Sequence, residues 1–153
     1  MKARTFLLSA AILALSATGA LAQACEGRGD GARLFVQVSG VRAATGEVAV
    51  TLYPDVARRF LAPRGKLLRV RARAAAPSTN VCFNLPAPGV YAIAIYHDAD
   101  GDRDFDRNLL GRPTEGFGFS NDAPASLGLP SFQSVRFTVH AGDNTIRIRT
   151  RYP

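Results

Sequence analysis

Hydrophobic and polar residues alternate along most of the chain with a period of two, and helical periodicity is scarce. Apolar runs of strand length are separated by glycine, proline and asparagine, which end strands and form turns. About seven short strands in one chain predict an all-β fold, an antiparallel β-sandwich. The predicted strands are residues 33–41, 47–53, 66–72, 80–85, 90–96, 134–140 and 144–151, and a short helix is expected at 55–61.

The predicted strands differ in how many of their faces are apolar. Strand 90–96 is apolar on both faces, which is typical of a central strand covered on both sides. Strands 66–72 and 144–151 alternate apolar residues with arginines, so each has one face in water. These two arginine rows are Arg69, Arg71 and Arg73 in the first strand, and Arg147, Arg149 and Arg151 in the second. A long segment rich in Asp, Gly and Pro covers residues 99–131, and connections of that length are usually functional or disordered.

The N-terminus has the pattern of a secretory signal peptide. Lys2 and Arg4 precede an apolar run at 6–17, and Ala20-Leu21-Ala22 supplies the small residues of a cleavage site. The run is shorter than the ~20 residues that span a bilayer, and no later run reaches that length. We therefore expect a periplasmic or secreted protein without a membrane span, with a signal peptide at 1–22, an N-terminal segment at 23–30 and a β-sandwich domain at 31–153.

The chain has two cysteines, Cys25 and Cys82. An exported chain meets an oxidising compartment, so we expect the two to form a disulfide. The alternative is two buried, unpaired cysteines. Acylation of Cys25 is less consistent with the sequence, because Ala22 and Gln23 fit a lipoprotein cleavage signal badly.

Acidic residues are concentrated in one short stretch. Five of the twelve Asp and Glu residues lie within nine positions, although the formal net charge of the chain is +7. Carboxylates so close repel one another, and calcium relieves that repulsion because it accepts several oxygen ligands in flexible geometry. The alternative is a solvated acidic turn, neutralised by Arg103, Arg107 and Arg112 without a metal. The five residues are Asp98, Asp100, Asp102, Asp104 and Asp106.

Their spacing matches the first part of an EF-hand loop, with Asp98 at the first position and the carbonyl of Asp104 at the seventh. Arg103 replaces the sixth-position glycine and the closing glutamate is missing, so the loop is not an EF-hand. Glu115 is the nearest free carboxylate downstream and is expected to close the site, with Asn108 and Asp122 as weaker candidates. Calcium is favoured over magnesium, which keeps its waters, and over zinc or copper, which prefer thiolate or imidazole ligands.

The most specific part of the sequence, residues 96–121, resembles a known family. The family is an exported bacterial one, called domain of unknown function 2141, and the resemblance covers most of residues 31–153. It implies a β-sandwich of transthyretin-like or immunoglobulin-like type and implies no activity. Asn and Gly are common in that family where this chain has Asp100, Asp102 and Arg103. The resemblance rests on Tyr96-His97-Asp98, the Asp-rich stretch, Asn108, Gly111-Arg112-Pro113 and Glu115-Gly116-Phe117-Gly118-Phe119-Ser120-Asn121.

Three further residues complete the candidate chemistry. Phe117 and Phe119 are expected to plug one end of the sandwich, and the alternative is an exposed aromatic platform for a sugar or a peptide. His97 is expected to be a packed or hydrogen-bonded strand-end residue. The sequence has no nucleophile or phosphate-loop motif, and crowded carboxylates in a wet loop lack the apolar cleft that a general acid needs, so a hydrolase is the less favoured alternative.

Together these features predict an exported, non-enzymatic β-sandwich module, stabilised by calcium in its acidic loop. The alternative function is binding of anionic envelope polymers, polysaccharide or lipopolysaccharide, through the two arginine rows or the glycine/phenylalanine segment. The simpler interpretation of the rows is a solvated, charged face. Nucleic acid is not an expected partner, because no aromatic residues are interleaved with these arginines.

Overall fold

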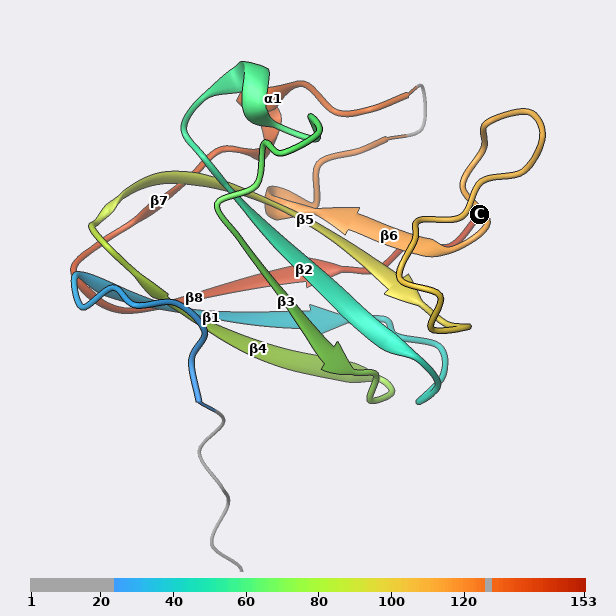
Figure 1. Cartoon of the computed structure of the whole chain (residues 1–153), viewed down its shortest axis with the longest axis horizontal. Coiled ribbons are helices and arrows are strands. Elements are labelled where there is room, and N and C mark those ends of the chain that lie inside the picture. Colours follow the sequence, from blue (N-terminus) through green and yellow to red (C-terminus); the bar gives the residue numbers. More distant parts are fainter. Residues whose placement is uncertain (1–23, 126–127) are drawn as a thin grey trace, which may run out of the picture.

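The computed structural model describes residues 24–125 and 128–153, and the predicted signal peptide at 1–22 lies outside them. Two β-sheets pack into a sandwich (Figure 1), which confirms the predicted all-β fold. The first sheet has the strand order β4-β1-β8, and the second has the order β3-β2-β5-β6, with β7 also paired to β5. The first sheet comprises β1 (Ala32–Ser39), β4 (Ser78–Leu85) and β8 (Gly142–Arg149). The second comprises β2 (Glu47–Pro54), β3 (Leu68–Arg73), β5 (Gly89–Asp98), β6 (Gly116–Phe119) and β7 (Phe137–Val139).

The predicted secondary structure is wrong at two places in the second half of the chain. The segment predicted as strand 134–140 begins as a helical turn, α1 (Phe132–Val135), because Ser131 caps it: its Oγ accepts a hydrogen bond from the Ser134 amide at 3.3 Å. Strand β6 was missed because its Gly-Phe-Gly-Phe sequence has low strand propensity. The helix expected at 55–61 is the single 3-10 turn η1 (Ala57–Arg59).

One strand pair departs from the antiparallel expectation. Strands β1 and β8 run parallel, with Leu34 beside Asn144 and Val38 beside Ile148. The chain crosses from β7 in the second sheet to β8 in the first, and β8 begins beside the first residue of β1, with Gly142 opposite Ala32. The other strand pairings in the described residues that join named strands are antiparallel.

The main core lies between the two sheets. Residues alternate along β2 and β5 so that Val50 and Ile93 are fully buried against the first sheet, where Leu34 and Val38 of β1 meet them. The opposite face of β5 is also covered, since Ala92 belongs to a second, smaller apolar cluster. The prediction that this strand is central is confirmed by its position between β2 and β6.

The second cluster covers one end of the outer face of the second sheet. It is formed where η1, η2 (Ser120–Asp122) and α1 meet β2 and β5. Phe119 packs in it, 5 % exposed, so this ring covers the sheet from outside and does not plug the space between the sheets. Ser120 fixes the arrangement: its Oγ accepts a hydrogen bond from the Ile93 amide at 2.9 Å and donates to the carbonyl of Val135.

The N-terminal segment is fastened to the free edge of the first sheet, beside β4. The predicted disulfide between Cys25 and Cys82 is confirmed. Beside it, the Glu26 amide donates to the Cys82 carbonyl at 2.9 Å, and the Asn84 amide donates to the Glu26 carbonyl at 2.7 Å. A side chain at Gly29 would collide with the backbone of Leu85. Residues 24–31 therefore run beside β4 and cover an edge of the sheet that would otherwise be open.

Candidate metal centre and its surroundings

The acidic loop, residues 98–106, begins at the last residue of β5. The Asp98 carboxylate is fully buried and accepts three hydrogen bonds: from the Gly101 amide at 2.9 Å, from the Arg103 amide at 3.0 Å and from Nη1 of Arg71 at 2.8 Å. These bonds curl the chain around one carboxylate. The first aspartate thus shapes the loop, and most of its acceptor capacity is already used.

Arg103 takes the backbone conformation that an EF-hand assigns to glycine. Its φ is 71°, in the left-handed region, so the tight turn forms although the side chain is large. The Arg103 carbonyl is held by Nη2 of Arg71 at 2.8 Å and by the Tyr96 hydroxyl at 3.3 Å. These contacts offset the cost of a left-handed conformation in a non-glycine residue.

Short Asp-to-backbone bonds continue the loop. The Asp102 amide donates to Oδ1 of Asp100 at 3.3 Å, and the Asp104 amide donates to Oδ1 of Asp102 at 2.8 Å. Asp104 in turn accepts from the Phe105 amide at 2.8 Å. Each aspartate therefore bends the chain onto itself, which keeps the carboxylates close together despite their charge.

Glu115 reaches the loop from the far side of the excursion. Strands β5 and β6 pair with His97 opposite Gly116, so Glu115 falls beside Asp98 across the strand pair. Its side chain is 9 % exposed; Oε1 accepts from the Ala99 amide and Oε2 from the Asp106 amide, both at 3.2 Å. This carboxylate holds the two ends of the acidic loop together.

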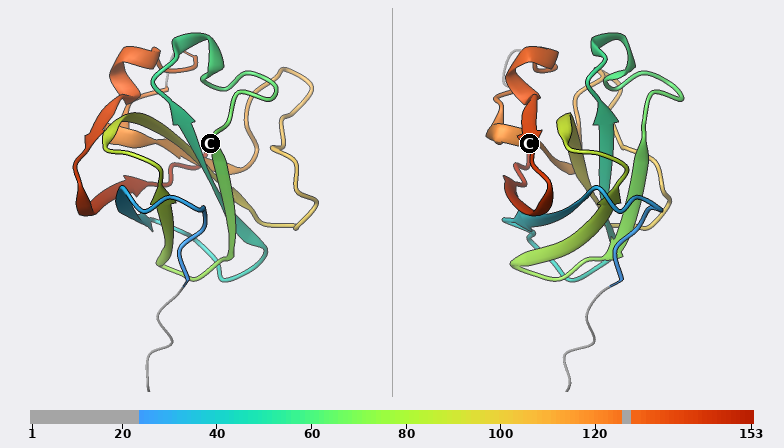
Figure 2. Two further views of the ribbon diagram at one scale, coloured as in Figure 1. Left: turned by 60° about the vertical axis from the view of Figure 1, so that its left-hand side comes forward. Right: turned by 90° about the vertical axis from the view of Figure 1, so that its left-hand side faces the viewer.

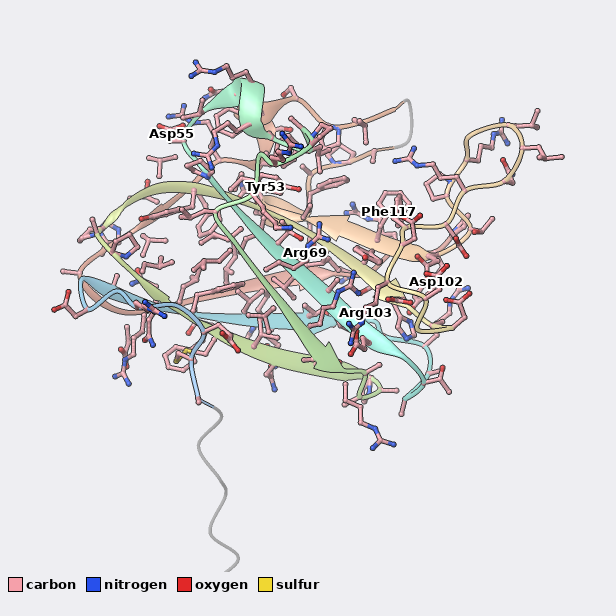
Figure 3. All side chains as sticks on the ribbon, viewed as in Figure 1. Tyr53, Asp55, Arg69, Asp102, Arg103 and Phe117 are labelled. Atoms are coloured by element: carbon pink, nitrogen blue, oxygen red, sulfur yellow. A yellow bond between two sulfur atoms is a disulfide. The ribbon has the colours of Figure 1, made fainter. Side chains whose placement is uncertain are left out.

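The structure brings the predicted ligands together in two groups that share one residue. Carboxylate oxygens of Asp98, Asp100 and Asp102 lie within 4.8 Å of one another, and so do those of Asp100, Asp106 and Glu115. The side chain of Asp104 is in neither group among the described residues. Figure 3 shows Asp102 and Arg103 at this end of the molecule. The ligand atoms that both groups offer are carboxylate oxygens, which suit a hard cation.

Crowding changes the acidity of two of these groups. The pKa of Glu115 is raised above its ordinary value, chiefly because the carboxyl is buried and also because the charges of Asp98 and Asp106 lie nearby. The pKa of Asp106 is raised by loss of solvent and by the other four aspartates. A bound cation would favour the charged forms that this environment disfavours.

The comparisons with known proteins identify a family for this chain. The profile of a family described as an uncharacterised protein conserved in bacteria, DUF2141, matches residues 36–147. The chain belongs to this family. No curated protein and no solved structure matches it. The immunoglobulin-like or transthyretin-like classification therefore stays a prediction.

The residues that carry the DUF2141 resemblance have structural roles around the acidic loop. His97 is 2 % exposed and lies between the Tyr152 hydroxyl, 2.8 Å from Nδ1, and the Thr45 carbonyl, 2.9 Å from Nε2, as expected for a hydrogen-bonded strand-end residue. Asn108 Oδ1 accepts from the amides of Leu110 and Arg112 and turns the arm at 106–114, which projects from the sandwich in Figure 2.

Gly118 of this DUF2141 domain illustrates why the Gly-Phe-Gly-Phe strand needs glycine. A Cβ on Gly118 would lie 2.5 Å from the Arg149 carbonyl oxygen, because β6 passes close to the chain that leaves β8. The amide of Phe117 donates to the Arg151 carbonyl at 2.9 Å and closes this corner of the sandwich. The phenylalanines therefore face the outside of the second sheet.

The two predicted arginine rows do not form one surface. Arg71 is tied to the acidic loop, with its side chain 18 % exposed and Nη1 2.8 Å from Oδ2 of Asp98. Arg151 donates to the carbonyls of Asp122 and Ala123. Arg147 and Arg149 are exposed on the first sheet, and Arg69 and Arg73 are exposed on the second. Sequence alternation identifies the charged face of each strand but not the neighbours across the sheet. Within the described part of the chain, no helix is long and apolar enough to cross a membrane.

Proposed function

We propose that this DUF2141 domain is an exported, non-enzymatic β-sandwich module whose acidic loop is fixed by a calcium ion. The observation that supports the proposal best is the position of Glu115. It comes from the opposite arm of a long excursion, and its carboxylate meets Asp100 and Asp106. A bound ion would join the two arms of the excursion to the end of the second sheet.

The ligand set that we propose is refined by the contacts of each carboxylate. Asp100, Asp106 and Glu115 carry most of the coordination, with Asp102 completing it from the neighbouring group. Asp98 has a guanidinium 2.8 Å away, so it contributes no more than one bond and mainly shapes the loop. Asp104 contributes its backbone carbonyl, as the seventh residue of an EF-hand does.

The proposal also includes export from the cytoplasm and a role without catalysis. A disulfide between Cys25 and Cys82 is compatible with an oxidising compartment outside the cytoplasm. The acidic cluster lies on an open loop where three of the five aspartates are exposed and Asp106 is half-buried, an environment that suits cation binding better than general acid catalysis.

Metal analysis combined with thermal melts tests the proposal. The purified domain should take up calcium after chelator treatment, and calcium should raise the Tm, whereas equal ionic strength from sodium chloride should not. Glu115→Gln should lose most of the calcium shift. Asp104→Asn is the matched control, since it removes the same charge from the same loop but no side-chain ligand.

Two results would count against the calcium site. The first is a Tm that does not respond to calcium or chelator. The second is an Asp104→Asn variant that loses as much of the calcium shift as Glu115→Gln, because that pattern belongs to a diffuse acidic patch in which every carboxylate counts equally.

A further inference from the structure

A groove of about 1030 Å³ lies on the outer face of the second sheet, beside the acidic loop. The groove forms because the side chains at the centre of this face are smaller than those around them. Across the sheet, Arg69 pairs with Thr51, Thr51 with Ala94, and Ala94 with Phe119. The two central strands thus present small side chains, and the edge strands present large ones. Figure 3 shows Tyr53, Arg69 and Phe117, three of the lining residues, which come from β2, β3 and β6.

Aromatic rings run along this face in an unbroken row. Phe119 lies 6.0 Å from Phe117, Phe117 lies 5.9 Å from Phe105, and Phe105 lies 5.4 Å from Tyr96, all between ring centroids. Phe117 is half-buried and lines the groove. The row joins the second apolar cluster to the acidic loop, so the groove is lined by aromatic rings along one side.

The polar lining of the groove is cationic. Four arginines line it, and none of its described lining residues has a carboxylate side chain. Arg151 is occupied by backbone carbonyls. Arg69 donates a hydrogen bond from Nε to the Thr51 Oγ1 at 2.7 Å and lies beside the Tyr53 hydroxyl, and Arg107 lies with its guanidinium carbon 5.0 Å from the Phe105 ring centre. Within residues 24–125 and 128–153, Arg69, Arg107 and Arg112 have no carboxylate within 4.0 Å.

Arg69 has no carboxylate partner among the described residues, and in this it differs from the next arginine on the same face of β3. Arg71, two residues beyond Arg69, is held by Asp98, Tyr96 and the Arg103 carbonyl. The side chain of Arg69 lies on the same face of the sheet as that of Arg71, but the residue opposite Arg69 on β2 is Thr51, which is not acidic. Guanidinium groups left without a counter-ion beside aromatic rings are suited to a ligand that brings the carboxylates itself.

We propose that this groove binds an acidic oligosaccharide, a short chain of uronic-acid-type sugars. Sugar rings present C–H faces that pack on aromatic rings, and their carboxylates match the planar fork of arginine. A peptide is a poorer fit. The floor strands β2 and β5 are both paired along their two edges, so they offer no backbone groups to an extended peptide. The binding site goes beyond the metal site, because none of the proposed metal ligands is among the described residues that line the groove.

Calorimetric titration with two matched sugars tests the inference, since the chain has no tryptophan to report binding by fluorescence. The probes are a glucuronate tetrasaccharide and the neutral glucose tetrasaccharide with the same linkage. The acidic sugar should bind and the neutral one should bind at least about tenfold more weakly. Each titration is run in calcium and in chelator, so that loss of the metal site and loss of the groove are distinguishable.

Matched arginine variants decide where the sugar binds. Arg69→Gln combined with Arg107→Gln should weaken binding by about tenfold or more. Arg147→Gln combined with Arg149→Gln removes the same charge from the first sheet and should leave the affinity unchanged. The inference is overturned if neither metal condition gives binding, if both double variants lose affinity equally, or if an oligoglutamate peptide binds as tightly as the acidic sugar.

Discussion

The exposed parts of the two sheets differ in what they hold. The free edge of the first sheet is paired with the N-terminal segment, which is fixed by a disulfide and by backbone hydrogen bonds to β4. The second sheet carries the aromatic row, the cationic groove and, at one end, the acidic loop with Glu115. The chain itself closes an edge of the first sheet, whereas the outer face of the second sheet presents side chains whose charges are unbalanced.

This difference arises from the side chains on each face. Along β4, the outward residue Cys82 lies close to the N-terminal segment and bonds to it. On the second sheet, the outward residues Thr51 of β2 and Ala94 of β5 are small, so the larger side chains of the edge strands and loops form walls around them. A sandwich whose stability rests on the first sheet and the shared core leaves the second face free to carry binding chemistry.

The largest expected effect is a loss of stability that leaves ligand binding unchanged. Replacing Cys25 and Cys82 by Ser should lower the free energy of unfolding by about 4 kcal/mol, because the bridge constrains a loop between residues 57 apart in the unfolded chain. Denaturant unfolding measures this. The shift of Tm with calcium and the affinity for the acidic sugar should be unchanged. A disulfide-free variant that also loses either response would contradict the division between the two faces.

A slightly smaller effect is expected at Asp98. Asp98→Ala leaves Arg71 and the amides of Gly101 and Arg103 without their shared acceptor, which should cost about 3 kcal/mol of stability and disorganise the loop. The double variant with Arg71→Met removes the unpaired guanidinium as well and should recover part of that loss. A double variant no better than Asp98→Ala would show that the ion pair is not what the carboxylate supplies.

Calcium binding should stabilise the domain by a comparable free energy, and the added protection should be confined to the second sheet and its acidic loop. At a free concentration a hundred times its Kd, calcium should stabilise the domain by about 2.7 kcal/mol. Amide hydrogen exchange followed with and without calcium should show added protection in residues 98–115 and little change in β1 and β4. Uniform protection of both sheets would contradict a local effect.

The smallest effect is a dependence of stability on pH. Because burial and neighbouring charges raise the pKa of Glu115, the folded state binds its proton more tightly than the unfolded state. In chelator, this contribution is fully present below the ordinary glutamate pKa of about 4.3 and is lost as the pH rises through the raised folded value. The Tm should therefore rise as the pH falls through that window.

Glu115→Gln is the control for this pH dependence, and thermal melts across the window measure it. Without the carboxyl, the rise in Tm on acidification should be smaller. Calcium binds the charged form, so its stabilisation should weaken in the same window. An identical pH profile in wild type and Glu115→Gln would mean that this group does not link protonation to folding.

Much of this molecule could be predicted from local pattern. Alternation placed the core strands, including the doubly covered β5, because side chains on a strand point to opposite faces in turn. Two cysteines in a chain with a predicted export signal predicted the disulfide. The spacing of the aspartates predicted a tight, acidic loop, and its closing residue Glu115 was identified as the nearest free carboxylate.

What the sequence did not determine is which strands lie beside one another. Arg71 looked like any other solvated arginine until the register of β3, β2 and β5 placed it level with Tyr96, next to Asp98. The same register put Thr51 and Ala94 side by side and opened the groove between Arg69 and Phe119. Alternation along one strand fixes the face on which a side chain lies, whereas its partners come from strands distant in sequence. Only the pairing of the sheets, driven by burial of the shared core, decides those partners.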